Sequence, residues 1–323
     1  MILYPIYSQL MIKQLFIGII IASSQLIHAQ EIKLNEYNVK THLNDFHLNG
    51  KVTKVISTAK DGNGHWATLP FLENEYFNQI ILEFNSQGYL QKQTNNLDYR
   101  GNLATYSYTE YQYNRQHQPT EIKTTVINNG EDPKRISSLK TYEYNPDGQL
   151  QQLYEAIQSK TTSTQYQTEF SYTNRLESVV HKTDGKKSGE LKFSYNKVGQ
   201  LIKQESFGFD GRNGQKRYFM YDGNTPIYEE LNIDGRAQMT FVNLNYKTSK
   251  FQQFDQNQQL KLELNFDSNH HVTAAKVQSF RTGKPFLSTY TIQYQSDAQN
   301  NWIRADIYQN GILEYIVQRE ITY

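Results

Sequence analysis

An aromatic residue that leads into a polar turn recurs nine times along the chain, and this repeat limits the folds it can adopt. The clearest copies are Tyr142–Leu150 (YEYNPDGQL) and Phe193–Leu201 (FSYNKVGQL). We call the aromatic residue before each turn the anchor, and the anchors recur at intervals of 20 to 31 residues. They are Phe84, Tyr113, Tyr144, Tyr172, Tyr195, Tyr221, Tyr246, Phe266 and Tyr294. Self-similarity of this kind indicates one supersecondary unit copied in tandem.

Each unit is predicted to be a β-hairpin. The residue two positions before the anchor is apolar in all nine copies, which places both side chains on one face of a strand. After the anchor, turns such as Asn145-Pro146-Asp147-Gly148 combine an Asn that bonds its own backbone with a Gly that accepts positive φ. An apolar residue such as Leu150 or Leu201 then restarts the strand pattern. Strand, turn and strand together make a hairpin.

Further polar turns join one unit to the next. They include Thr183-Asp184-Gly185, Asp210-Gly211-Arg212 and Gln309-Asn310-Gly311. Nine two-stranded units predict about eighteen antiparallel strands in sequence order, and sheets of more than about ten strands curl because strand twist accumulates. No stretch shows the apolar spacing of a capped helix. We therefore predict an all-β fold in which tandem hairpins over residues 81–323 form a long curled antiparallel meander, either a spiral or an open barrel.

The N-terminal part of the chain does not show the repeat. Residues 1–29 are typical of a secretory signal peptide, with an apolar run at Leu15–Ala22 and a small residue at Ala29. The alternative is an uncleaved segment that holds the protein in the membrane. Translation could start at Met1 or at Met11. We interpret residues 30–80 as an N-terminal cap with the first strands, intended to cover a sheet edge. The segment from Gln299 to Tyr323 would supply the closing strands.

The amino-acid composition limits the cellular locations and the classes of partner that we expect for the protein. The chain has no cysteine, which excludes disulfides and a lipid-modified N-terminus, so the exported protein would be periplasmic or secreted. A net charge of +1 gives no support for a nucleic-acid partner or an anionic membrane surface. Its 25 Tyr and 16 Phe favour strands and argue against disorder despite a mean hydropathy of −0.74.

The repeated unit, Tyr-x-Tyr-Asn/Asp-x-x-Gly-x-Leu, resembles the tyrosine–aspartate (YD) repeat of the RHS family. The resemblance covers about residues 48–323 and is best at Phe84–Leu90, Tyr142–Leu150 and Phe193–Leu201. In long members of that family the repeats wind into a shell of β-strands that encloses a toxin domain. This chain lacks the Asp-Pro self-cleavage motif near its C-terminus, and we expect no cargo domain; Asp132-Pro133 lies in mid-chain. The resemblance therefore implies the fold rather than toxin delivery.

Residues able to carry chemistry are sparse, and we predict no catalytic residue, no metal site and no cofactor. Metalloprotease, nucleophile-elbow and phosphate-loop motifs are absent. His270-His271 and the acidic pairs Glu229-Glu230 and Glu131-Asp132 are sequence neighbours that would point to opposite faces of a strand. Asp61-Gly62-Asn63-Gly64 could offer oxygens to calcium, but no Glu stands at loop position twelve, which favours a plain turn.

The aromatic side chains could either form the core or bind a ligand. Two inward rings per unit are what a thin sheet needs to bury apolar area, so we interpret the anchors as structural. Trp66 and Trp302 fit the repeat least and are the candidates for an exposed contact, with packing near the termini as the alternative. The function predicted is a non-enzymatic binding or scaffolding protein with an unidentified protein or glycan partner. The alternatives are a periplasmic immunity protein and a carbohydrate-active enzyme.

Overall fold

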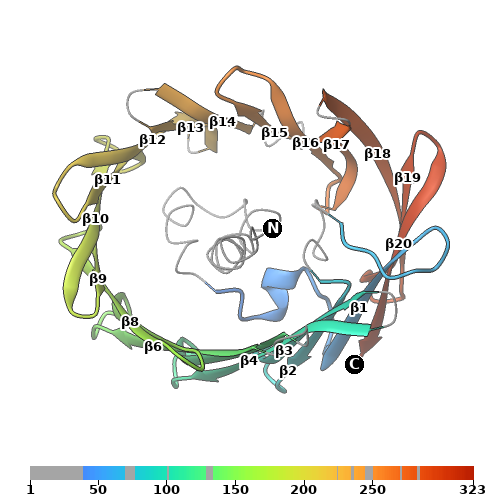
Figure 1. Ribbon diagram of the computed structural model, residues 1–323, viewed down its shortest axis with the longest axis horizontal. Coiled ribbons are helices and arrows are strands. Elements are labelled where there is room, and N and C mark those ends of the chain that lie inside the picture. The colour runs from blue at the N-terminus through green and yellow to red at the C-terminus, as the bar shows by residue number, and fades with distance from the viewer. Residues whose placement is uncertain are drawn as a thin grey trace, which may run out of the picture.

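The fold is one antiparallel sheet that curves into a ring. A computed structural model describes residues 39–69, 77–99, 102–128, 134–223, 225–233, 236–243, 250–269, 271–281 and 284–323. The described residues form twenty strands, each paired with the strands before and after it in the chain (Figure 1). A 3-10 helix, η3 (Leu43–Phe46), lies on the inner side of this ring, and no helix follows it among the described residues. The predicted all-β meander of hairpins is confirmed.

The strands differ in length from six to thirteen residues. In chain order they are β1 (Lys54–Asp61), β2 (Gln79–Phe84), β3 (Leu90–Tyr99), β4 (Asn102–Tyr113), β5 (Pro119–Asn128), β6 (Lys134–Tyr144), β7 (Leu150–Gln158), β8 (Ser163–Tyr172), β9 (Leu176–Thr183), β10 (Lys186–Tyr195), β11 (Leu201–Gly208), β12 (Asn213–Asp222), β13 (Thr225–Ile233), β14 (Arg236–Asn243), β15 (Lys250–Asp255), β16 (Leu260–Phe266), β17 (Val272–Arg281), β18 (Lys284–Ser296), β19 (Trp302–Gln309) and β20 (Ile312–Thr322).

The first and last strands close the sheet on itself. β1 pairs with β2 on one side and with β20 on the other, with Lys54 opposite Thr322 and Asp61 opposite Tyr315. The region expected to cover a sheet edge therefore supplies the strand that removes the edge, because its backbone groups pair on both sides. Twenty strands about 4.8 Å apart and tilted by about 40° give a cylinder roughly 40 Å across, measured between backbones. At that width, side chains from opposite walls cannot meet.

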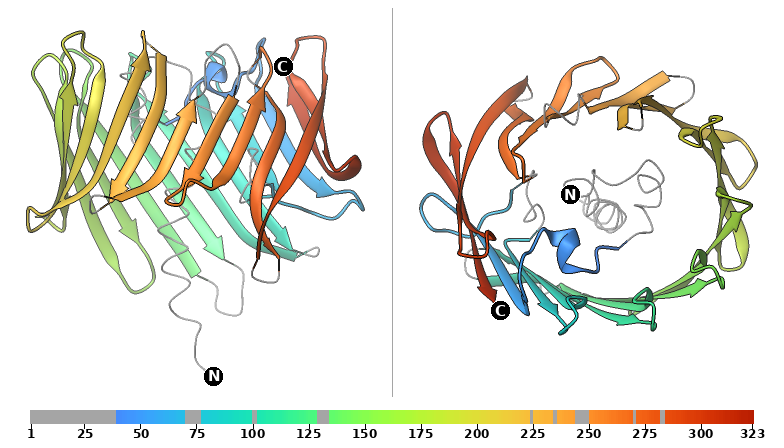
Figure 2. Two further views of the ribbon diagram at one scale, coloured as in Figure 1. Left: turned by 90° about the horizontal axis from the view of Figure 1, so that it is seen from above. Right: turned by 180° about the vertical axis from the view of Figure 1, so that it is seen from behind.

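The turns that follow the anchors lie at one end of this cylinder, which we call the anchor rim. Figure 2 shows η3 and the C-terminus at this end. The side-chain oxygen of the residue after the anchor accepts the backbone N–H groups two and four positions on, as Asn85 does from Gln87 and Tyr89 at 2.9 Å. Asn114, Asp267 and Asp297 accept the same pair of N–H groups. The repeated Asn or Asp is thus a structural requirement of one turn geometry.

Six tyrosine anchors join neighbouring units through their hydroxyl groups, and we call this set of bonds the tyrosine ladder. Each tyrosine donates to a backbone carbonyl of the preceding hairpin, at the residue that restarts its second strand. The six bonds run from Tyr113 to Leu90 (2.6 Å), Tyr144 to Pro119 (2.8 Å), Tyr172 to Leu150 (3.0 Å), Tyr195 to Leu176 (2.7 Å), Tyr221 to Leu201 (2.8 Å) and Tyr294 to Val272 (2.9 Å). The ladder explains the preference for Tyr over Phe, since a buried hydroxyl requires a partner.

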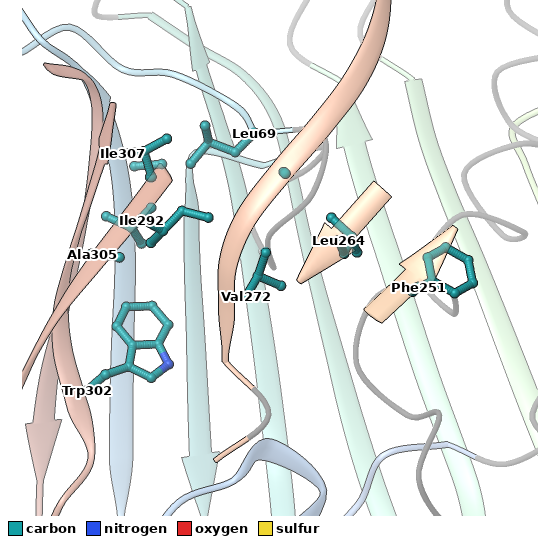
Figure 3. Packing of buried hydrophobic residues seen from close by; sticks show 11 residues of the cluster. Leu69, Phe251, Leu264, Val272, Ile292, Trp302, Ala305 and Ile307 are labelled. Atoms are coloured by element: carbon teal, nitrogen blue, oxygen red, sulfur yellow. The ribbon is translucent and has the colours of Figure 1, made fainter. Parts of the chain in front are cut away.

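The core is a belt along the inner wall, divided into three clusters of buried apolar side chains. One cluster joins η3 to β1–β3 through Leu43, Leu82 and Phe84. A second follows β5–β12, and a third follows β15–β20. Figure 3 shows part of the third cluster, in which Leu69 lies near Ile307. Because each cluster is only one side chain deep, stability depends on contacts within the wall.

The outer face is polar and carries ion pairs that cross strands. Glu263 is 4% exposed and bonds Lys250 at 2.8 Å and Lys276 at 3.0 Å. Burial raises the pKa of this carboxyl, but hydrogen bonds from both lysines outweigh the burial and lower the pKa to about 2. A charge buried among long side chains is therefore compensated on both sides.

The connections at the other end, which we call the opposite rim, vary from hairpin to hairpin. Asp184-Gly185 and Asn310-Gly311 are two-residue turns in which both residues have positive φ. Asp61 accepts N–H groups from Asn63 and His65, two and four positions on and both at 2.9 Å, so this turn repeats the anchor-rim geometry. Asp255 does the same with Asn257 and Gln259. The predicted turn at Asp61–Gly64 is confirmed, and its carboxylate is occupied by its own backbone.

Candidate functional site

A recess of about 470 Å³ lies on the anchor rim, between the turn after β2 and the turn after β4. It is lined by Asn85, Gln87, Gln91, Tyr111, Gln112, Tyr113, Asn114, Arg115 and His117. Adjacent hairpins bring the two turns together, although they are about 30 residues apart in sequence. Five of the nine side chains are amides and none is an acid, which distinguishes the recess from the mixed charges of the outer face.

A stack of aromatic rings stands beside the recess. The ring of Tyr89 lies parallel to His117, with a centroid distance of 4.5 Å and an interplanar angle of 11°. His42 meets the same tyrosine edge-on at 4.8 Å, and Tyr113 lies 5.5 Å away. Since Tyr89 covers one face of the His117 ring and that side chain is exposed, the remaining face is accessible.

The segment leading into η3 fixes this stack from the inner side. The Leu43 N–H donates to the Gly88 carbonyl at 2.9 Å, and the Leu90 N–H donates to the Thr41 carbonyl at 2.6 Å. Gly88 has φ +86°, and a Cβ there would lie 3.0 Å from both His42 and Leu43. Only glycine fits, because the backbone is left-handed and the inner segment packs directly on it.

His117 occupies a backbone position that three other anchor-rim turns give to glycine and a fourth gives to Asn300. Its φ is 62°, and the equivalent glycines are Gly88, Gly148 and Gly199, with φ between 79° and 90°. A side chain in the left-handed region costs about 1 kcal/mol. The strain places an imidazole on Tyr89 where a glycine would leave the ring bare. Backbone strain that positions a side chain at a recess is a feature of functional sites.

Several polar side chains of the recess are available to a ligand. Gln91 is the extra residue of the β-bulge beside Phe84, since Glu83 pairs with Lys92 and Phe84 pairs with Leu90. A bulge redirects a side chain, and Gln91 is exposed. The side chains of Gln87, Gln91 and Arg115 have no hydrogen-bond or ion-pair partner within the described part of the chain.

Two carboxylates that interact with lining residues have partners of their own. Asp45 accepts the N–H groups of Thr41 at 2.8 Å and His42 at 2.9 Å. Glu121 accepts a hydrogen bond from Gln112 at 3.3 Å. Burial raises the pKa of Tyr113, with the charges of Tyr111 and Asp45 adding to the effect, so its phenol stays neutral. The free charge of the recess is therefore positive and comes from Arg115.

The two tryptophans singled out in the sequence lie elsewhere. Trp302 is 8% exposed and packs in the wall, with the Arg319 guanidinium 3.5 Å above its ring. Trp302 therefore packs inside the protein, as the alternative interpretation expected, and is not an exposed contact. The reason is its position at the start of β19, where the side chain points to the inner face. Trp66 is half-buried, with Lys60 5.5 Å from its ring. Neither lines the recess.

The remaining candidate residues are dispersed. Glu229 pairs with Arg217 at 3.7 Å, whereas Glu230 bonds Tyr228 and Asn232, so the two carboxylates take different partners. His271 lies 3.4 Å from Asp267 in its own turn. The predicted signal peptide (1–29), the anchor Tyr246, His270 and the pair Glu131-Asp132 lie outside the described residues. The other anchors lie in or beside the inner belt and the tyrosine ladder.

The described residues contain no cluster of three or more His, Asp or Glu side chains able to hold a metal ion. Among the same residues, no helix has the length and apolar character to cross a membrane.

Comparisons with known proteins give weak matches. Neither a protein-family model nor a curated protein matches the chain. Among solved structures, a porin-like protein from Bacteroides uniformis ATCC 8492 is 11% identical with a TM-score of 0.38, covering 85% of this chain and 99% of its own. A porin-like protein from Bacteroides vulgatus ATCC 8482 is 13% identical with a TM-score of 0.22 and the same coverage. The TcdB2-TccC3 structure is 9% identical with a TM-score of 0.22, covering 79% of this chain and 20% of that one. At these scores the matches do not establish a shared fold.

The recess itself was not foreseen from sequence. Tyr89 and His117 are 28 positions apart, and their contact depends on which hairpins are neighbours. One signal was present: His117 stands in a turn where the repeat favours glycine.

Proposed function

We propose that the protein is an exported, non-enzymatic binding or scaffolding protein of the YD-repeat type. In this proposal the closed sheet is a rigid frame, and the anchor rim presents the binding surface. The observation that carries the proposal is the recess between the first two anchor-rim turns, where side chains without partners surround an aromatic stack.

The distribution of aromatic residues supports the rim as the place for a ligand. The anchors and the apolar residues two positions before them pack in the wall, so they are not free to stack on a partner. The His117 ring, by contrast, is exposed. A pocket with aromatic surface and a few convergent polar groups is the usual form of a ligand site.

The polar groups of the recess support binding rather than catalysis. Apart from the His117 imidazole and two tyrosines, the lining consists of amides and a guanidinium, which hold ligands by hydrogen bonds but do not act as general acids or bases near neutral pH. Hydrolysis of glycosides needs two carboxylates across a cleft, and the lining of the recess has none.

The test is capture of a partner from envelope extract or on a glycan array, using the mature chain. We expect a macromolecule to be retained at micromolar protein concentration. The matched control is the Gln87→Ala, Arg115→Ala double variant, which should lose that partner while its β-sheet circular dichroism is unchanged. Absence of any retained macromolecule, or equal retention by the control, would contradict the proposal.

A further inference from the structure

We propose that the anchor-rim recess binds an acidic sugar unit of a glycan, with the sugar ring against His117 and the sugar carboxylate on Arg115. This inference deepens the proposed function and rests on it. The argument combines the shape of the recess, its hydrogen-bonding groups and its charge.

The aromatic surface indicates a flat ligand with C–H groups. One face of His117 is covered by Tyr89, and that tyrosine is in turn held by His42 and Tyr113. The stack is therefore rigid before a ligand arrives, which reduces the entropy lost on binding. A sugar ring presents apolar C–H groups on one face and hydroxyls at its edge, and this matches a single exposed aromatic face bordered by amides.

The amides indicate hydroxyl groups on the ligand. Gln87 and Gln91 have no side-chain partner in the part of the chain that the structure describes, and each offers both a donor and an acceptor. A hydroxyl group likewise donates and accepts, so an amide satisfies it in either sense. A phosphate or a sulfate would leave the amide oxygens without donors.

The guanidinium indicates an acid on that ligand. Arg115 is exposed and has no ion-pair partner among the described residues, and no Asp or Glu lines the recess. Asp45 and Glu121, which interact with the lining residues Tyr113 and Gln112, already accept hydrogen bonds. Arg recognises a carboxylate through two parallel N–H groups, which gives direction as well as attraction.

Isothermal titration of the mature chain with three probes tests the inference. The probes are a galacturonate oligomer, a galactose oligomer of the same length, and poly-glutamate. We expect the galacturonate oligomer to bind about tenfold more tightly than the galactose oligomer, which corresponds to one charge-assisted pair. Poly-glutamate should not bind measurably, because it lacks the ring and the hydroxyls.

Two variants separate the contributions of the two side chains. Arg115→Gln should reduce affinity for the galacturonate oligomer to that of the galactose oligomer and leave the latter unchanged. His117→Gly should weaken both oligomers by about tenfold. It should not unfold the turn, since glycine occupies the same position in three sister turns. Gln258→Gly is the matched control: Gln258 has φ 58° in an equivalent turn between β15 and β16 at the opposite rim, and this change should alter neither affinity.

Three results would overturn the inference. They are equal binding of poly-glutamate, equal affinities for the two oligomers, or no binding of either oligomer. If neither oligomer binds but envelope capture still retains a partner that depends on Gln87 and Arg115, the proposed function stands and the ligand class is wrong. If capture also fails, both fall.

Discussion

The turns at one rim of the cylinder are more uniform than those at the other, although the same strands connect the two rims. At the anchor rim, an Asn or Asp after the anchor accepts the same two N–H groups in turn after turn, and six tyrosine hydroxyls each bond a hairpin to the previous one. At the opposite rim, Asp61 repeats that geometry, whereas Asp184-Gly185 is a two-residue turn in which both residues have positive φ. The repeat motif thus specifies one end of each hairpin, and the other end is left to local turn chemistry.

The difference extends to burial. Leu201, which restarts its strand at the anchor rim, is 1% exposed, whereas Phe209, just beyond the other end of the same strand, is 79% exposed. The seam between β1 and β20 runs along both strands, and at the anchor rim Asn301 adds hydrogen bonds to Asn49 and Tyr323. We therefore expect the anchor rim to carry most of the stability, and the predictions below test this expectation.

Raising the pH should have the largest effect, because it acts on the whole tyrosine ladder. Burial raises the pKa of Tyr144, Tyr172 and Tyr221 to about 12. The folded state favours the neutral phenols, so their contribution is complete below the unfolded pKa of about 10 and is lost as the pH rises toward 12. We expect cooperative loss of the far-ultraviolet circular dichroism in this window, with ladder phenols ionising only as the sheet unfolds. Ionisation of every tyrosine near pH 10 without unfolding would show that the ladder is not buried.

Substitutions at the two ends of β11 compare the rims directly. Leu201→Ala should destabilise the protein by about 2–5 kcal/mol, because it leaves a cavity in the belt. Phe209→Ala should change the free energy of unfolding by less than about 0.5 kcal/mol, because the ring is solvated. Urea unfolding of both variants measures the difference. Similar losses for the two would contradict a stability gradient between the rims.

Sequence reasoning succeeded where the information is local. The residues Asn145-Pro146-Asp147-Gly148 are enough to predict a turn, and the alternation of apolar and polar residues before Tyr144 is enough to predict the inward face. The meander of hairpins could therefore be predicted from the sequence. Closure could not be predicted, because the pairing of Lys54 with Thr322 depends on the accumulated curvature of the intervening strands. The recess was missed for the same reason.

The seam provides a third comparison. Asn301 is 1% exposed; its Oδ1 accepts the Asn49 N–H at 2.7 Å, and its Nδ2 donates to the Asn49 carbonyl at 2.9 Å and to the Tyr323 hydroxyl at 2.8 Å. Asn301→Ala leaves buried backbone groups unsatisfied and should cost about 1–3 kcal/mol. Asn63→Ala, in an exposed turn of the opposite rim, should stay within about 0.5 kcal/mol of the parent. Thermal unfolding followed by circular dichroism checks both, and a stable Asn301 variant would mean that the seam is held by β1–β20 pairing alone.

Removing one bond of the ladder should give the smallest effect. Tyr144→Phe deletes the hydroxyl that donates to Pro119 and should cost about 0.5–1.5 kcal/mol. Tyr218→Phe removes a hydroxyl from a partly exposed ring on the outer face and should be neutral within error. Denaturant midpoints at constant slope measure both changes. Equal midpoints for the two variants would mean that tyrosine is preferred at the anchors for the packing of its ring and not for its hydroxyl group.

Pairing of β1 with β20 has a consequence for how such a chain can change by gene duplication. An open array lengthens when a unit is copied, and its existing neighbours stay in place. A closed sheet has no free edge to extend, so each duplicated hairpin must be accepted into the circumference, which grows by two tilted strands or about 12 Å. The diameter of the cylinder is therefore set by the number of repeats, and it can change only in steps of one hairpin.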